Sequence, residues 1–294
     1  MNRHAYLIMA HDDPQLLKTL LKLLDAPYND IYLHIDVKAK FDIEQVKTYV
    51  TESKLCFIKR MNVKWGGYSL TECVIRLLEE AIKTEHTYYH LLSGHDLPIK
   101  NRKEIYDFYE KNSGIEYIAF NRPEIKADVL EGLTRYKGLF KNAFLERCSQ
   151  KIQKVLRIDR SKRHGLTYMK GSNWFSITHE LASYVVANES LCKKLFRYTR
   201  NSDEMFLQTL VFNSPFKERL CTDFHDLKYR VFESDKPMAN YRAMDWPDEL
   251  EHAHPKVLTI GDLDALKKSN AFWARKFDSK TDSEVICQIY NLYR

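Results

Sequence analysis

A short acidic segment offers carboxylates that could act as a general base at the start of a helix. Ser202, Asp203 and Glu204 stand immediately before residues 205–212, whose apolar side chains recur at helical spacing. A carboxylate on a rigid helix end that faces a cleft can take a proton from a hydroxyl group. Carboxylates in the first turn also suit the helix dipole, so spacing alone favours an ordinary capped helix start over a catalytic group.

Basic residues in the last forty or so positions of the sequence could form a phosphate-binding site. Lys256 follows a proline, and Arg275 and Lys276 lie between aromatic residues. Apolar neighbours partly desolvate a cation, and such a cation binds phosphate more strongly than one at an open surface. For Lys256 an equally good interpretation is a lysine whose stem lies along a strand with its charge in water.

Other candidates stand where predicted strands end. The first third of the chain alternates strands and helices, which indicates parallel strands joined by right-handed crossovers. Strands are expected over residues 5–10, 30–36, 55–58 and 88–92, and helices over residues 15–24 and 70–84. Ligands of such sheets bind at the carboxyl ends of the strands. Four positions fall at or just after these ends: His11, Asp36, Trp65 and Asp96. We therefore predict that they form one site.

Residues 170–177, which lie before the acidic segment, are expected to be a strand entered through a Gly-Ser turn. This stretch holds Ser172 and Trp174, and Thr178 is a candidate N-cap for the helix that follows. Trp65, Trp174, Trp246 and Trp273 all lie in segments that carry candidate residues. Tryptophan rings suit the C–H faces of sugars, although a place in the core is their commoner role.

What the sequence lacks disfavours several classes of protein. It has neither of the glycine loops that cradle phosphates and no G-x-S-x-G elbow, so a kinase, a P-loop NTPase and a dinucleotide oxidoreductase are poorly supported. Six cysteines without a C-x-x-C pair argue against a zinc site and a disulfide framework, and they fit a reducing compartment. His90 and His95 bracket a strand end and are not expected to converge with His86, so no metal is expected.

The composition, with 44% hydrophobic and 29% charged residues, is that of an ordinary soluble protein. Because the sequence has no long apolar run and no signal-peptide pattern, we expect a cytoplasmic protein. The net charge of +6 fits a nucleic acid, a phosphorylated ligand or an anionic lipid, and distinguishes none of them. Residues 123–163 are basic and helical in pattern. A solvated helical excursion is favoured there, ahead of an acceptor-site wall or a patch that faces a membrane.

Taken in order, eight segments resemble the core-2/I-branching glycosyltransferase family, which includes the peptide O-xylosyltransferases. The segments are residues 5–11, 34–38, 63–69, 91–100, 170–175, 202–204, 245–246 and 273–278. Each is weak alone, but their order and spacing along nearly the whole chain are specific. The resemblance is thinnest over residues 123–163.

This resemblance implies an α/β fold of the GT-A-like type: a Rossmann-like, nucleotide-binding mixed sheet flanked by helices, with a helical insertion and a carboxyl-terminal extension. We expect one domain over residues 1–294, divided into a nucleotide-binding half (1–122), a basic helical insertion (123–169) and an acceptor and catalytic half with a diphosphate-binding tail (170–294). The implied reaction is an inverting transfer of GlcNAc, of β-1,6 type, from a UDP-sugar without a divalent metal. Xylose or another UDP-hexose is the alternative donor sugar.

The resemblance also implies roles for single residues. Glu204 corresponds to the catalytic base. The donor side is expected to comprise His11, Asp36, Trp65, Lys256, Arg275 and Lys276, the last three as the diphosphate clamp. The substrate side is expected to comprise Asp96, Arg135, Ser172, Trp174 and Trp246. Fixed cations can stabilise the charge of the departing UDP in place of a metal.

The expected setting is a bacterial cytoplasmic enzyme that acts on a glycan or glycolipid acceptor, with peripheral contact at the inner membrane face. A sugar-binding subunit of a polysaccharide-synthesis complex is the non-enzymatic alternative, and Glu204 argues against it because a pure binder needs no base. Nucleic-acid binding through residues 123–163 is disfavoured, and no nucleic-acid partner is expected.

Overall fold

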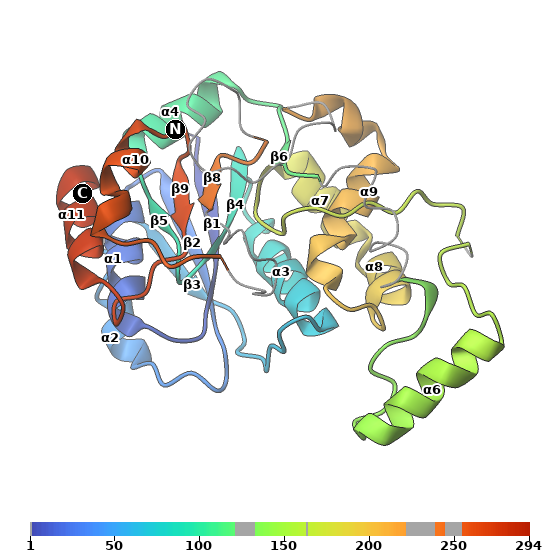
Figure 1. Cartoon of the computed structure of the whole chain (residues 1–294). Coiled ribbons are helices and arrows are strands. Elements are labelled where there is room, and N and C mark those ends of the chain that lie inside the picture. Colours follow the sequence, from blue (N-terminus) through green and yellow to red (C-terminus); the bar gives the residue numbers. More distant parts are fainter. Residues whose placement is uncertain (1, 121–132, 163, 222–238, 245–254) are drawn as a thin grey trace.

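The sheet at the centre of the molecule combines parallel and antiparallel strands (Figure 1). The computed structural model describes residues 2–120, 133–162, 164–221, 239–244 and 255–294. Six strands lie in the order β3-β2-β1-β4-β7-β6. Their bounds are β1 His4–Ala10, β2 Asn29–Ile35, β3 Lys54–Phe57, β4 Tyr88–Ser93, β6 Tyr117–Ile118 and β7 Phe175–Thr178. β1 to β4 pair in parallel, whereas β7 is antiparallel to β4 and to β6.

The described residues form ten α-helices, most of which flank this sheet on its two faces. They are α1 Pro14–Leu24, α2 Ile43–Lys47, α3 Tyr68–Ala81, α4 Arg102–Lys111, α6 Ala143–Val155, α7 His179–Ala187, α8 Glu189–Phe196, α9 Phe206–Phe212, α10 Leu263–Lys268 and α11 Ser283–Tyr293, with short 3-10 turns η2 Ser202–Glu204, η3 Pro215–Arg219 and η4 Ile260–Asp262. The mixed sheet and its flanking helices confirm the predicted α/β fold class.

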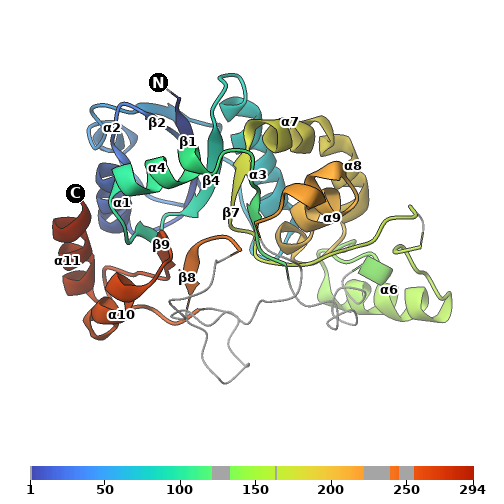
Figure 2. The same cartoon turned by 90° about the horizontal axis from the view of Figure 1, so that it is seen from above.

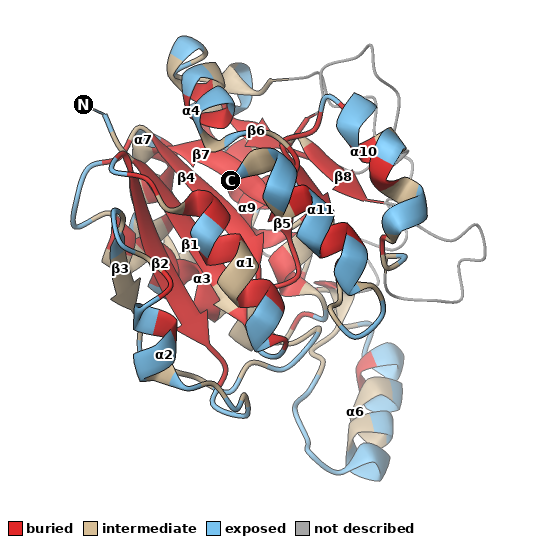
Figure 3. Cartoon of the chain, turned by 90° about the vertical axis from the view of Figure 1, so that its left-hand side faces the viewer, coloured by how far each residue is buried: buried red, intermediate tan, exposed pale blue. Residues whose placement is uncertain are grey.

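Alternate side chains of β1 enter two separate hydrophobic clusters because successive strand residues point to opposite faces. Tyr6 and Ile8 pack in the cluster that includes α1 and α11. Ala5 and Leu7 pack in the cluster that includes α3, α7 and α9. Figure 3 shows the strands buried between helices whose outer faces are exposed. The sheet is thus covered on both sides, and its carboxyl-terminal edge is where loops can gather.

Local sequence signals set the starts of two helices, one of them at the predicted N-cap Thr178. The Asp13 carboxylate accepts a hydrogen bond from the Leu16 N–H (3.0 Å), and Pro14 opens α1. The Thr178 hydroxyl accepts from the Leu181 N–H (3.4 Å) at the start of α7. Side-chain oxygens at these positions satisfy backbone N–H groups that have no partner inside the helix.

A second, three-stranded sheet brings the last part of the chain to the end of β4. It has the order β5-β9-β8, with β5 at Leu97–Pro98, β9 at Trp273–Arg275 and β8 at Arg242–Met244. β9 is antiparallel to β5 and parallel to β8. The fully buried Trp273 ring packs edge-on against Tyr6 of β1, with ring centroids 5.7 Å apart. The two sheets therefore share a core.

Helix α6 stands apart from the layered body in both views (Figures 1 and 2). It lies within the segment expected to be a basic helical insertion. Among the described residues, no helix is long and apolar enough to cross a membrane.

Candidate active site

Three strand-end loops meet at one edge of the large sheet. The Asp36 N–H, after β2, donates to the Ala10 carbonyl at the end of β1 (2.9 Å). The Gly94 N–H, after β4, donates to the Met9 carbonyl (2.8 Å). The structure thus brings His11, Asp36 and the segment containing Asp96 to the same edge, as parallel pairing requires.

Asp36 is a buried anchor for the loop that leads to Trp65. Its two carboxylate oxygens accept hydrogen bonds from the Lys38 N–H (2.8 Å) and the Val63 N–H (2.9 Å). Burial opposes the negative charge, but these N–H groups and the Lys38 ammonium hold the pKa of Asp36 below its ordinary value. Because both oxygens are engaged, this side chain fixes the loop in place.

The Trp65 loop is joined to the acidic segment. The Asn201 N–H donates to the Gly66 carbonyl (2.9 Å), and the hydroxyls of Thr71 and Ser202 lie 2.8 Å apart. Gly66 has φ +67°, and a Cβ there would lie 2.8 Å from the Asn201 side-chain oxygen, so only glycine fits. The Trp65 side chain is 60% exposed beside this junction. It is therefore available to a ligand.

Glu204 ends the η2 turn with its carboxylate partly exposed. Its Oε2 lies 3.1 Å from the Lys170 ammonium, and its backbone carbonyl accepts from the Gly171 N–H (2.8 Å). A Cβ on Gly171 would lie 1.9 Å from the Ala119 carbonyl oxygen, so this strand entry requires glycine. The carboxylate is held on a fixed turn and remains 37% exposed, which is what a base that meets an acceptor hydroxyl needs.

The sequence analysis assigned no role to Asp203, although Asp203, like Glu204, is a carboxylate just before the predicted helix. It is buried, with one oxygen 3.4 Å from the Asn173 amide nitrogen. Among the described residues its other oxygen has no hydrogen-bond partner. Burial, together with the charge of Glu204, raises the pKa of Asp203 to about 7. The turn therefore presents the Glu204 carboxylate outward and holds a second, weakly acidic carboxyl inside.

Asp96 and Arg275 form a buried ion pair beneath Trp174. Asp96 Oδ2 accepts from the Ser93 N–H (2.9 Å), and its Oδ1 lies 3.1 Å from Arg275 Nη1. The Arg275 guanidinium stacks on the Trp174 ring, 4.1 Å from the ring centre. Burial lowers the pKa of Arg275, and the Asp96 charge opposes that shift. This pair orients Trp174 and joins β9 to the end of β4.

A second buried arginine, Arg242, was missed by the sequence analysis. Its guanidinium donates to the Leu91 carbonyl (2.8 Å) and lies 5.1 Å from the centre of the Trp273 ring. Burial lowers the pKa of Arg242 to about 10, with the Asp96 charge acting in the opposite direction. Because the residue stands in an unremarkable part of the sequence, nothing in the pattern distinguished it from a surface arginine.

The two predicted clamp lysines lie on neighbouring segments. The Leu258 N–H donates to the Lys276 carbonyl (2.8 Å), which aligns the chain around Lys256 with the end of β9. The Lys256 ammonium lies 3.0 Å from Asp262. The N–H of Phe277, the next residue after Lys276, donates to the His95 carbonyl (3.0 Å), so Lys276 lies one residue from a segment that is hydrogen-bonded to the loop of His95.

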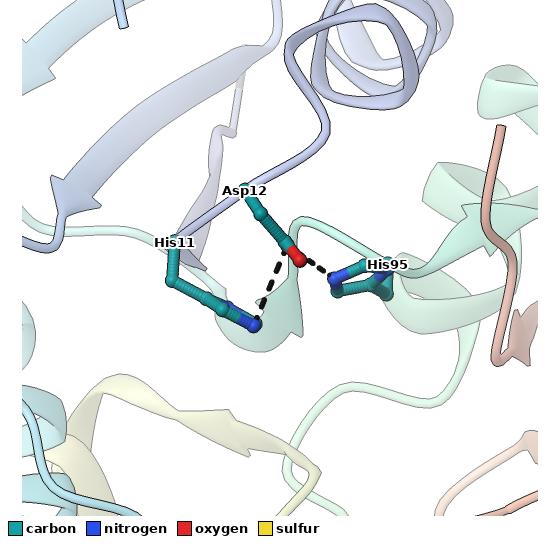
Figure 4. Close-up of side chains that lie close together, drawn as sticks. All are labelled: His11, Asp12 and His95. Atoms are coloured by element: carbon teal, nitrogen blue, oxygen red, sulfur yellow. Dashed lines mark hydrogen bonds and ion pairs between the residues drawn. The ribbon is translucent and has the colours of Figure 1, made fainter. Parts of the chain in front are cut away.

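His11, Asp12 and His95 converge at the ends of β1 and β4 (Figure 4). Asp12 Oδ1 lies 2.6 Å from His95 Nε2 and 3.4 Å from His11 Nε2. His95 Nδ1 lies 2.8 Å from the Phe277 carbonyl oxygen. A carbonyl and a carboxylate both accept hydrogen bonds, so this pairing favours a proton on each ring nitrogen of His95 and hence the charged form of the ring.

The electrostatics agree with a charged His95. Burial disfavours its charge, but the hydrogen bonds to Asp12 and the Phe277 carbonyl raise the pKa of His95 overall. The hydrogen bond from His95 lowers the pKa of Asp12. These three side chains offer ligand atoms within 4.8 Å of one another and could hold a metal ion. An ion there would have to displace the His95 proton and face the Lys276 charge, so the donor set suits a proton better.

Of the predicted substrate-side residues, Asp96, Trp174 and Ser172 are linked through described contacts, whereas Arg135 lies elsewhere. Ser172 accepts from the Trp174 N–H (3.3 Å) and lies next to the Glu204 turn through Gly171. The Arg135 carbonyl accepts from Arg160 (3.4 Å), in the segment that leads to α6, and no described contact links Arg135 to the strand-end loops. Trp246 lies outside the described residues.

Comparison with known proteins gives a consistent result. The family model described as Core-2/I-Branching enzyme matches residues 4–267. The chain is 25% identical to a xylosyltransferase of Ciona intestinalis and 26% identical to xylosyltransferase oxt of Drosophila melanogaster, over 99% and 92% of its length. It spans about a third of those relatives (34% and 31%). The structure of mouse xyloside xylosyltransferase 1 aligns over 92% of this chain and 96% of that chain, with 10% identity and a TM-score of 0.40, which is too weak to support an argument.

Proposed function

The chain belongs to the Core-2/I-Branching enzyme family, and from this premise we propose that it is a glycosyltransferase that moves a sugar from a UDP-sugar to a hydroxyl of a glycan or glycolipid. The observation that carries the proposal is the setting of Glu204. This partly exposed carboxylate is held on a turn that is hydrogen-bonded through Asn201 to the Trp65 loop. The same loop is hydrogen-bonded to the strand-end carboxylate of Asp36.

In the proposed mechanism Glu204 takes the proton from the acceptor hydroxyl as its oxygen attacks the anomeric carbon. UDP leaves from the opposite face, so the configuration is inverted. The leaving diphosphate gains negative charge, which preorganised cations stabilise. Lys276 and the His95 cation stand at the strand ends and serve this purpose without a divalent metal. Arg275 acts through Trp174, because its own charge is paired with Asp96.

The transferred sugar has two candidates. The sequence resemblance favours GlcNAc. The curated relatives that match nearly the whole chain are named xylosyltransferases, which favours xylose. Both sugars suit the same base and the same cations, because both donors undergo the same displacement at the anomeric carbon with UDP as the leaving group.

UDP release from a panel of UDP-sugars, with excess EDTA and with added Mn²⁺, tests the proposal. Glu204→Gln serves as the catalytic blank. We expect release from UDP-xylose or UDP-GlcNAc that EDTA leaves unchanged and that the blank lacks. Strict dependence on Mn²⁺ would overturn the metal-independent mechanism, with the His11–Asp12–His95 group as the place to look for the ion. Equal release by the blank would remove Glu204 from the reaction.

A further inference from the structure

Helix α6 has its polar side turned toward its own chain. The Glu146 carboxylate accepts from the Gly138 N–H (2.8 Å) and the Phe140 N–H (3.1 Å). Gln150 donates to the Tyr136 carbonyl (2.6 Å), and the buried Gln153 accepts from the Tyr136 N–H (2.7 Å). A helix on a globular protein usually places its apolar stripe on this inner side. The arrangement in α6 is reversed.

The apolar side of α6 points away from the body. At 100° per residue, its apolar residues apart from Ala143 fall on one continuous sector on the side away from the inward glutamines. The exposed members of this sector, which we call the α6 apolar face, are Phe144, Leu145, Ile152, Val155 and the adjacent Leu156. Phe144 is 72% exposed and Val155 is 80% exposed. Large apolar groups gathered on one exposed face mark an interaction site. Figure 3 shows exposed and intermediate residues along most of the helix.

Basic residues border this face. Arg147, Lys151 and Lys154 are exposed and lie together along one edge of the α6 apolar face at helical spacing. Exposed Lys141 and Arg157 stand just beyond the two ends of the helix. The single acidic residue of α6, Glu146, is engaged by backbone N–H groups on the inner side. The outward surface is therefore apolar and positive.

We propose that the α6 apolar face and its basic border bind the surface of an anionic lipid bilayer, with the helix lying in the plane of the interface. Apolar side chains on one face enter the acyl boundary of the interface, and lysines and arginines beside them meet anionic headgroups. A second copy of this chain fits the face less well, because antiparallel pairing of two such helices about a twofold axis brings their basic edges together.

The helix is joined firmly enough to the body to act as a fixed docking element. The Lys137 N–H donates to the Tyr198 carbonyl just after α8 (2.8 Å), and Tyr136 is bound by both glutamines of α6. α8 belongs to the same cluster of packed residues as α3 and α9, which hold the Glu204 turn. A membrane bound at α6 would thus have a fixed position relative to the Glu204 turn. The proposal does not depend on the glycosyltransferase activity.

Flotation of the purified full chain with lipid vesicles tests it directly. One vesicle type contains phosphatidylcholine alone, and the other also contains phosphatidylglycerol. Binding to the anionic vesicles should exceed binding to the neutral ones and should weaken with salt. Phe144→Ser combined with Ile152→Ser and Val155→Ser should weaken it by at least about tenfold. Lys151→Gln with Lys154→Gln should do the same for anionic vesicles. The matched control is Lys47→Gln with Lys83→Gln, at the last residue of α2 and just after α3.

Circular dichroism and UDP release without vesicles check that the variants remain folded, since the changed side chains face solvent. Absence of binding to either vesicle type would overturn the proposal. Equal binding by the serine variant or the lysine variant would also overturn it. The face would be assigned to a second copy of the chain by a different result: no vesicle binding, and a dimer in light scattering that the serine variant abolishes. Failure of UDP release with intact vesicle binding would count against the proposed function alone.

Discussion

Replacing Asp203 with asparagine should stabilise the protein at neutral pH and flatten the pH dependence of its stability. The side chain is 7% exposed, and the pKa of its carboxyl is raised by burial and by Glu204 to about 7, from an ordinary value of 3.8. The difference is about three units, each equivalent to about 1.4 kcal/mol, so the effect on the free energy of unfolding is at most about 4 kcal/mol.

The sign follows from which state loses its proton first. Below about pH 4 the Asp203 carboxyl is protonated in both the folded and the unfolded chain and has no net effect. As the pH rises toward 7, the unfolded chain ionises first, so the free energy of unfolding falls until the folded carboxyl ionises as well. Asparagine has the same shape and no titration, so the variant lacks this fall. Glu116, whose pKa burial also raises to about 7, keeps its own contribution in both proteins.

Urea unfolding followed by circular dichroism at several values between about pH 5 and pH 8 measures the effect. The variant should gain about 1–4 kcal/mol over the parent near pH 8, and less near pH 5. Asp264→Asn, at a side chain that is 88% exposed, is the matched control and should change stability by less than about 0.5 kcal/mol at every pH. Identical pH curves for the parent and Asp203→Asn would refute the inference that a buried carboxyl titrates at this turn.

Three further substitutions separate binding from chemistry and from stability. Glu204→Gln should lower UDP release by at least about 100-fold, since glutamine keeps the shape of the side chain and cannot take a proton. The affinity for UDP, measured by calorimetry, should stay within about threefold. A matching loss of UDP affinity would contradict the role of Glu204 as the base. Lys276→Ala should weaken UDP affinity and turnover together by about tenfold or more, because it removes a cation from the strand ends; unchanged affinity would exclude it from the diphosphate site. Arg275→Met should lower the free energy of unfolding by about 3–5 kcal/mol in urea, because Asp96 would remain buried without its partner; a loss below about 1 kcal/mol would mean that the pair is exposed to water in solution.

Periodicity predicted the elements that carry local signals. The expected strands over residues 5–10 and 88–92 correspond to β1 and β4, and the expected helix over residues 70–84 corresponds to α3 Tyr68–Ala81. The strands β5, β8 and β9 were not predicted, because each has only two or three residues and exists through pairing with distant segments. Such pairing leaves no short-range pattern to detect.

The candidate site was predictable where topology alone places a residue, and not where burial or a distant contact decides its chemistry. The meeting of His11, Asp36 and Asp96 follows from parallel strands ending at one edge. The charge on His95 could not be inferred, because Asp12 is 83 residues away along the chain and the Phe277 carbonyl is 182 away. The weak acidity of Asp203 depends on burial, which its sequence neighbours do not reveal.

The docking of β9 beside the end of β4 has a consequence for the order in which the site is assembled during synthesis. Asp96 and His95 leave the ribosome about 180 residues before their partners Arg275 and Phe277. Until then the nascent chain holds the Asp96 carboxylate without its guanidinium partner and a strand end without its closing segment, while the earlier strands can already pair. A ribosome stalled before residue 273 would therefore display most of the large sheet but not the complete candidate site.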